Sequence, residues 1–452
     1  MVAAAEQPGE ISTRAGWAAL TSILTVLVAI AALAPKTFLS GVVPLPKPPD
    51  ALVDRAQEIA KRLAVPAAAD SAYSFERDGA YLRYVARTDP SPSRWKGLAT
   101  ARPGPILFLY RQSPRPMTPQ ALVRVTEDDP PLDRSGMARI VLDPTGRLVR
   151  FTAVRNEAAP SEKLDIDWMP FLAEAGFAAR DLKPAAPSRR APVDNDRKDA
   201  WDGTYRDQPG VSFHVEAASS RGAPVWFSVF GPWNGPERRG EEDASPMAAF
   251  GDAVLWVFFV AVELGGLWLA RRNLLQGRGD RRGALRLAAV LFVVYLAAAL
   301  LHAHHAGGLS AEYPFVQRIV ARALYVSALV WIYYVALEPF VRRRWPRLLI
   351  SWSRLLQGRF RDPLVARDLL VGALAGVVTV LIGQVTILIP SFFGASALSP
   401  HPSLLQPLGE AREVAWFLVF NVWFAVMASI AALCFLLILR VALRRDVLAV
   451  LA

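Results

Sequence analysis

Six apolar runs of about 20 residues each constrain this chain more than any other feature of its sequence. A helix of that length crosses the ~30 Å hydrocarbon core of a bilayer, whereas the apolar stretches of soluble domains are shorter or interrupted. The pattern excludes an ordinary soluble enzyme and predicts a polytopic α-helical membrane protein with about six spans. The runs cover residues 15–34, 248–270, 285–304, 318–340, 368–390 and 414–439, the last five forming a transmembrane domain at 248–439.

The first run, residues 15–34, permits two interpretations. Ala32, Leu33 and Ala34 resemble the small-residue site at which a secretory signal peptide is cleaved. The next residue, Pro35, disfavours cleavage there, and the run is longer than the apolar core of a typical signal peptide. We therefore expect an uncleaved transmembrane anchor.

The connections between the runs alternate between arginine-rich and arginine-poor segments, and this alternation accounts for much of the net charge of +11. Segments 271–286 and 341–367 are rich in arginine, whereas 305–317 has no arginine or lysine and 391–412 has arginine only at its edge. Loops rich in lysine and arginine face the cytoplasm. The alternation predicts a cytoplasmic N-terminus at 1–14, an extracytoplasmic segment at 35–247 and a cytoplasmic tail at 440–452.

The extracytoplasmic segment has the pattern of an α+β domain, and nothing in it is long and apolar enough to span a bilayer. Apolar residues at helical spacing predict an amphipathic helix over 50–65. Asp143 and Gly146 enclose a turn between two β-rich arms, which predicts a hairpin over 137–154. We also expect strands at 81–86, 105–111 and 121–127, a short helix at 168–177 and a second hairpin at 211–231 with its turn near 219–222.

This order of helix followed by strands occurs twice, at 50–155 and at 165–233. The segments "PGPILFLYR" (103–111) and "GAPVWFSVF" (222–230) are alike, since each is an apolar strand entered through a proline. The pattern is typical of a duplicated helix-plus-sheet unit. The proline-rich, charged stretch 183–200 between the strands is predicted to be a loop.

One candidate metal cluster is present, in the segment "LHAHHAGG". His302 and His305 would face the same ion if the helix of the third run continued through both, with His304 beside them. No second metal-binding motif of the HExxH kind accompanies them, and the bland alternative is three interfacial histidines at a helix end. The sequence thus offers only weak candidates and predicts no cofactor.

Glu263 lies inside the second run, about two turns before its terminal arginines. Acids inside a membrane are costly and often functional, so Glu263 is a candidate intramembrane polar site. The favoured alternative is that Glu263 faces other helices and pairs with an arginine or a backbone group, or is neutral. Glu338 is close to Arg342 and is expected to form an ion pair at the membrane interface. Gln384 and Asn421 raise the same question as Glu263.

Three glycines on the fifth run, Gly372, Gly376 and Gly383, have the spacing of one helix face. Small residues allow helices to approach closely within a membrane. We expect these glycines to serve helix packing rather than chemistry.

The motifs of nucleotide-binding and hydrolytic enzymes are missing from this sequence, which has no GxxxxGK[ST], HRD, DFG or GxSxG. Its single cysteine, Cys434, allows no disulfide within one chain. The chain is therefore not expected to be an enzyme by itself. The alternatives are a membrane-embedded metal-dependent enzyme that uses the three histidines, and a small transporter lined by the polar residues of the spans.

The segment "PFVRRRWPRLLISWSRLLQGRFRDP" (339–363) is the most basic connection. Leu348, Trp352, Leu355 and Leu356 share one helical face, with Ser351 largely off it, which predicts an amphipathic helix on the cytoplasmic surface in contact with anionic lipid. It would serve as a topology anchor or as a coupling element. Nucleic acid is not an expected partner, because the basic residues are divided among short loops. The candidate coupling loop comprises Arg342, Arg343, Arg344, Arg347, Trp352, Arg354, Arg359 and Arg361.

Two segments carry a resemblance to a known family: "GVVPLPKPPDALVDRAQEIAKRL" (41–63) and "ALEPFVRRRWPRLLISWSRLLQGRFRDPLVARDLLVG" (336–372). With most of the chain, they resemble the membrane half of large bacterial serine/threonine protein kinases of the acidobacterial type. The resemblance implies a non-catalytic sensor module in the bacterial inner membrane, whose partner is a cytoplasmic kinase domain or a second copy of itself. In that family a kinase domain precedes the first span and further spans follow, so we expect Met1 to mark a stand-alone relative, a truncated gene or a late start, and the tail to be truncated.

Overall fold

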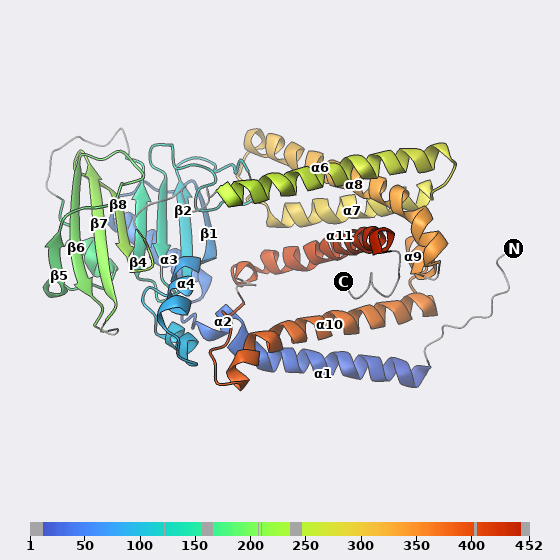
Figure 1. Ribbon diagram of the computed structural model, residues 1–452. Coiled ribbons are helices and arrows are strands. Elements are labelled where there is room, and N and C mark those ends of the chain that lie inside the picture. Colours follow the sequence, from blue (N-terminus) through green and yellow to red (C-terminus); the bar gives the residue numbers. More distant parts are fainter. Residues whose placement is uncertain are drawn as a thin grey trace.

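The computed structural model describes residues 12–121, 123–155, 166–206, 208, 210–235, 246–346, 348–401 and 405–443. A sheet domain lies at one end of a set of long helices (Figure 1). Within the described residues, 6 helices are long and apolar enough to cross a membrane, which confirms the six predicted runs. They are α1 (Thr13–Thr37), α6 (Pro246–Leu275), α7 (Arg281–His302), α8 (Leu309–Arg344), α10 (Pro363–Phe392) and α11 (Ala411–Leu443).

These helices are longer than the apolar runs and extend into the predicted connections. Between α6 and α7 only residues 276–280 are not helical, because Asp280 caps α7 by accepting a hydrogen bond from the Gly283 amide at 2.8 Å. Successive helices run in alternating directions, so the arginine-rich connections 271–286 and 341–367 lie at the end far from the sheet domain (Figure 1). We call this the far end, and the end beside the sheet domain the near end.

The long helices pack in two groups. In the four-helix group, α7 packs on α8 and α11, and α6 packs on α8, around buried residues such as Leu287, Leu291 and Val330. In the other group α1 and α10 lie side by side, and among the described elements α10 has its extensive contacts with α1 and with the short helix α9 (Leu348–Leu356) only. The two groups therefore have little direct contact along their length.

The predicted packing role of the α10 glycines is wrong. A Cβ atom added at Gly372, Gly376 or Gly383 would meet nothing within 4 Å. The reason is that α10 packs mainly on α1, and these glycines lie on a face of α10 that none of the described helices covers.

The sheet domain contains one antiparallel sheet of eight strands in the order β1-β2-β3-β4-β8-β7-β6-β5. Two four-stranded meanders thus meet where β4 pairs with β8, with Phe151 opposite Phe227. Helix α3 (Pro49–Arg62) precedes the first meander, and α5 (Met169–Glu174) precedes the second. The strands are β1 (Asp70–Arg77), β2 (Ile106–Ser113), β3 (Ala138–Leu142), β4 (Leu148–Ala153), β5 (Leu182–Ala185), β6 (Arg197–Thr204), β7 (Ser212–Ser220) and β8 (Ala223–Phe230).

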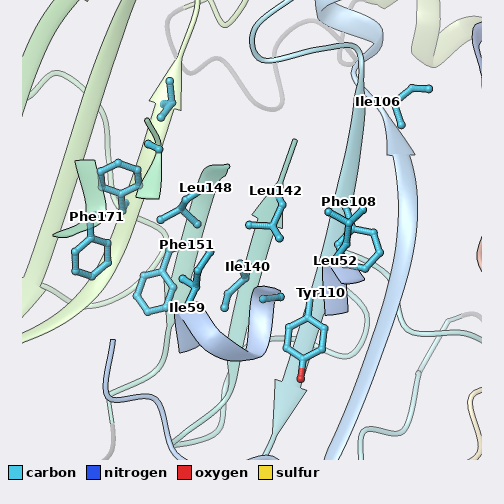
Figure 2. Packing of buried hydrophobic residues seen from close by; sticks show 14 of the residues in the cluster. Leu52, Ile59, Ile106, Phe108, Tyr110, Ile140, Leu142, Leu148, Phe151 and Phe171 are labelled. Atoms are coloured by element: carbon cyan, nitrogen blue, oxygen red, sulfur yellow. The ribbon is translucent and has the colours of Figure 1, made fainter. Parts of the chain in front are cut away.

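The hydrophobic core lies on one face of this sheet. Leu52 and Ile59 of α3 pack against Phe108, Ile140 and neighbouring strand residues, as Figure 2 shows. Helix α3 confirms the predicted helix over 50–65. The opposite face, which we call the outer face, carries most of the polar strand residues, including Arg111, Arg139 and Glu216.

Both predicted hairpins are confirmed, because the Asp143 carboxylate accepts from the Thr145 and Arg147 amides and β7 turns into β8 at residues 221–222. The strand predicted at 81–86 is wrong. That segment belongs to helix α4 (Gly79–Thr88), since the Asp78 side chain caps the helix by accepting from the Tyr81 amide. The described part of 121–127 is neither helix nor strand, so the strand predicted there does not form in those residues. The predicted loop 183–200 contains most of β5 and the first half of β6, so that prediction holds only between the two strands.

Candidate functional site

The near end joins the sheet domain to the four-helix group through polar contacts. The His304 ring, which follows α7, lies with Nε2 at 3.0 Å from both carboxylate oxygens of Asp70 in β1. The His304 amide donates to the Val123 carbonyl at 2.8 Å. Arg318 of α8 donates to the carbonyls of Pro119 and Gln120 at 2.7 and 2.9 Å. These contacts hold β1 and the loop after β2 against the ends of α7 and α8.

A second set of contacts joins the sheet domain to the α1–α10 group. The Trp95 indole, in the 3-10 helix η1 (Arg94–Ala99), donates to the carbonyl of Ala397 at 2.8 Å, just beyond α10. His401 accepts from the Leu39 amide at 3.0 Å and donates its own amide to Thr37 at 2.7 Å. Leu39 opens the short helix α2 (Leu39–Val42) and is fully buried in the sheet-domain core. The sheet domain therefore bridges the two helix groups at the near end (Figure 1).

The three histidines face three different carboxylates. His302 Nδ1 lies 2.8 Å from Glu413, His304 contacts Asp70, and His305 Nδ1 lies 3.2 Å from Glu312. The expected arrangement of His302 and His305 on one helix is not formed, because α7 ends at His302 and Ala303 is extended with φ −69° and ψ 140°. Within the described ranges, no three His, Cys, Asp or Glu side chains are grouped to hold a metal ion.

At the far end, α9 connects the two helix groups again. Its Trp352 and Leu356 side chains pack on the buried cluster of the four-helix group. On its other side, Ser351 donates to the Asp368 carboxylate of α10 at 2.5 Å. Ser351 was expected largely off the apolar face, yet it is buried, because it points to α10. The helix that the sequence predicted therefore forms, and its side chains pack on the neighbouring helices of this chain.

The arginines of the predicted coupling loop have different surroundings. Arg354 pairs with Asp362 at 2.8 Å, and this guanidinium holds the pKa of the Asp362 carboxyl below its usual value. Arg342 pairs with Glu338 at 2.5 Å, which is the predicted ion pair. The remaining described members, Arg343, Arg344, Arg359 and Arg361, are exposed, and Arg347 lies outside the described residues.

The polar residues inside the spans do not converge on one site. Glu263 of α6 accepts a hydrogen bond from the Tyr325 hydroxyl of α8 at 3.1 Å. Asn421 donates to the Phe417 carbonyl of its own helix at 2.6 Å. Gln384 is 3% exposed, and neither polar atom of its side chain has a hydrogen-bond partner among the described residues. Glu263 thus serves as a link between α6 and α8.

No family model, curated protein or solved structure matches this chain. The partners of the histidines and of α9 (Asp70, Glu413, Trp95 and Asp368) were not found by sequence reasoning. Glu413 and Asp368 lie at or near the ends of apolar runs, where a titratable residue is a usable signal. Asp70 and Trp95 have no local signal, because their partners lie 234 and 302 residues away.

Proposed function

We propose that this chain is a non-catalytic, membrane-spanning sensor module, in which the sheet domain lies outside the cytoplasm and the far end lies inside it. One observation carries the proposal: two helix groups with little mutual contact are bridged by the sheet domain at one end and by α9 at the other. A change in the sheet domain would shift one group against the other, and α9 would respond.

The distribution of charge supports the orientation. The arginine-rich connections 271–286 and 341–367 both lie at the far end, together with the start of α1 (Figure 1). Segments rich in arginine remain in the cytoplasm during insertion. The sheet domain, at the opposite end of the same helices, then faces the outside of the inner membrane.

The mechanism we propose is a small sliding motion. Packed helices shift past one another by about 1–2 Å in many switching proteins. Here α1 and α10 would move together, because they pack along their length. Ser351 would carry this motion from α10 to α9, whose Trp352 is held by the four-helix group. The exposed arginines beside α9 would present the change to a cytoplasmic partner.

We further propose that this partner is a serine/threonine kinase domain, either covalently attached or separate, as the resemblance to bacterial receptor-type kinases implies. The chain itself carries none of the kinase motifs. A second copy of the chain is the other candidate partner. Neither the metal-dependent enzyme nor the transporter has a specific observation in its favour, since the histidines pair with separate carboxylates and Glu263 pairs with Tyr325.

Reporter fusions test the orientation. A periplasm-active reporter fused after residue 150 is expected to be active, and the same reporter after residue 280 inactive. Cytoplasm-active reporters at the same positions give the reverse pattern. Either position reporting from the wrong side contradicts the proposal.

Thiol labelling tests the coupling. In a Cys434→Ser background, Ser353→Cys places a single thiol on α9. We expect Asp70→Asn, which weakens the His304 contact by removing its charge, to change the labelling rate at position 353 by about threefold or more, because a small free-energy change redistributes the states. Glu312→Gln is the matched control, since it weakens the His305 contact in the same way without touching the sheet domain. Equal rates in both variants would contradict coupling through the sheet domain.

A further inference from the structure

One row of side chains on the outer face of the sheet lines two adjoining cavities. Glu76 of β1 lies opposite Leu107 of β2, and at the other end His214 of β7 lies between Phe230 of β8 and Asp202 of β6. Each cavity has a volume of about 910 Å³. The two share the lining residues Arg189, Phe230, Pro232, Asn234 and Gly235, so they form one groove across the sheet.

The groove is long enough to hold an extended polymer. It reaches from β1 and β2 to Lys183 on β5, the strand at the opposite edge of the eight-stranded sheet. Neighbouring strands are about 4.8 Å apart, so the groove is about 30 Å long. A compact metabolite would fill only a part of it.

At the β5 end the groove is polar and its carboxylates are already paired. Asp181 pairs with Arg206 at 2.5 Å, and Asp202 lies 2.6 Å from the His214 ring. The other ring nitrogen of His214 lies 2.9 Å from Glu216. Burial lowers the pKa of His214, but its hydrogen bonds to the two carboxylates offset this and raise the pKa above 6.5. Carboxylate and amide oxygens here can accept hydrogen bonds from hydroxyl groups, and an anionic polymer without hydroxyl groups has no donor for them.

At the β1 end the groove carries unpaired positive charge. Arg77, Arg83 and Arg87 are exposed and, among the described residues, their guanidinium groups form no hydrogen bond or ion pair. Arg83 and Arg87 are four residues apart on α4, which places their Cβ atoms about 6 Å apart on one helix face. Glu76 lines the same end of the groove. Its carboxyl is partly buried, and burial together with the nearby Glu127 raises its pKa.

We propose that this groove binds an acidic glycan, a hydroxyl-rich chain that carries carboxylate or phosphate groups. The arginines of the β1 end bind the anionic groups through charge-assisted hydrogen bonds. Asp202 and Asn234 accept from sugar hydroxyls. Tyr84 and Phe230, whose ring carries the Arg189 guanidinium at 4.6 Å, also line the groove. This inference rests on the proposed function, because a glycan of the cell envelope reaches the sheet domain only outside the cytoplasm.

Two sources of such a glycan are compatible with the groove. One is a soluble envelope polysaccharide, and the other is the sugar headgroup of an acidic lipid. The arginine end lies toward the membrane, since η1, which follows α4, bonds to the segment after α10. A headgroup could enter from that side, and the experiment separates the two sources.

The test measures binding to the full-length protein in lipid nanodiscs by isothermal titration calorimetry. The probes are an oligogalacturonate of about six sugars, the neutral maltohexaose and inorganic polyphosphate of similar length. We expect the oligogalacturonate to bind at least ~10-fold more tightly than either of the others, because only it matches both ends of the groove. The double variant Arg83→Gln with Arg87→Gln is expected to lose ~10-fold in affinity for it. Arg115→Gln, an exposed arginine at the other end of β2, is the control and leaves affinity unchanged.

Each outcome has a defined meaning. Tight binding in zwitterionic nanodiscs supports a soluble glycan, and binding that is competed away by an acidic glycolipid in the nanodisc supports the headgroup. Absence of oligogalacturonate binding, polyphosphate binding equally well, or Arg115→Gln weakening binding as much as the double variant would each overturn the inference. Both faces of a nanodisc are open to the probe, so binding is measured whichever way the protein is oriented in a cell. These results are therefore independent of the reporter fusions and the thiol labelling that test the sensor proposal.

Discussion

The contact between His304 and Asp70 makes a quantitative prediction about how the sheet domain is held. Both side chains are 14% exposed, and the ring nitrogen reaches both carboxylate oxygens at 3.0 Å. A hydrogen bond to a charged group contributes about 1.5–3 kcal/mol when it is shielded from water. In His304→Ala the Asp70 carboxylate keeps its bond to the Met117 amide at 2.7 Å, so it is not left without a partner. We therefore expect a loss of about 2 kcal/mol in the local stability of the near end.

Hydrogen exchange of the full chain in nanodiscs, read by mass spectrometry, measures this loss. The residue 304 amide donates to the Val123 carbonyl, so its exchange reports the opening of this junction. A loss of 2 kcal/mol accelerates exchange by about 30-fold when opening is local. The control is His305→Ala, which breaks a His–carboxylate pair of the same type that is 45% and 24% exposed and does not reach the sheet domain. A pair so exposed contributes about 0–1 kcal/mol to local stability, so its loss accelerates amide exchange at most ~5-fold.

The reasoning is refuted if the two variants accelerate exchange at residues 117 and 304 equally, or if neither does. Equal effects would mean that solvent screens the His304 pair as it screens the His305 pair. No effect would mean that the backbone contacts alone hold the junction.

Three further predictions concern the far end, the spans and the outer face. Trp352→Ala is expected to lower the free energy of unfolding by about 2 kcal/mol, measured by thermal denaturation in detergent, and an unchanged midpoint would contradict the docking of α9. Gly266→Leu should cost about 1–3 kcal/mol because its Cβ would lie 2.9 Å from the Tyr333 ring, whereas Gly376→Leu should change stability by less than ~0.5 kcal/mol; reversed effects would contradict the helix grouping. The pKa of His214 is higher in the folded protein than its unfolded value of 6.5, so protonation of His214 stabilises the fold. This contribution is fully present below pH 6.5 and is lost as the pH rises through the folded-state pKa. The melting temperature should therefore fall as the pH rises above about 6.5, and His214→Gln should flatten that dependence; an unchanged pH profile in the variant would contradict this role of His214.

The parts of the fold that the sequence predicted are those that depend on local chemistry. Apolar runs of bilayer length leave few alternatives, and the turn at Asp143 and Gly146 specifies its hairpin through bonds within five residues. The segment 81–86 was misread as a strand because its apolar residues suit either period, and the decisive signal was the Asp78 cap three residues upstream. The candidate site was harder still, because the partners of His304 and Trp95 lie in distant segments that no periodicity connects.

The glycines of α10 show why the arrangement of the spans escaped prediction and why it matters for function. Small residues at helical spacing indicate close packing only if another helix covers that face, and here none of the described helices does. With few contacts between the α1–α10 group and the four-helix group, the polar links at their ends determine how the groups stand relative to each other. Apolar packing inside a membrane has no counterpart of the hydrophobic effect to oppose sliding, since lipid replaces protein at little cost. In the sensor mechanism proposed above, a ligand that alters the near-end links by a few kcal/mol would be sufficient to change the position of α9.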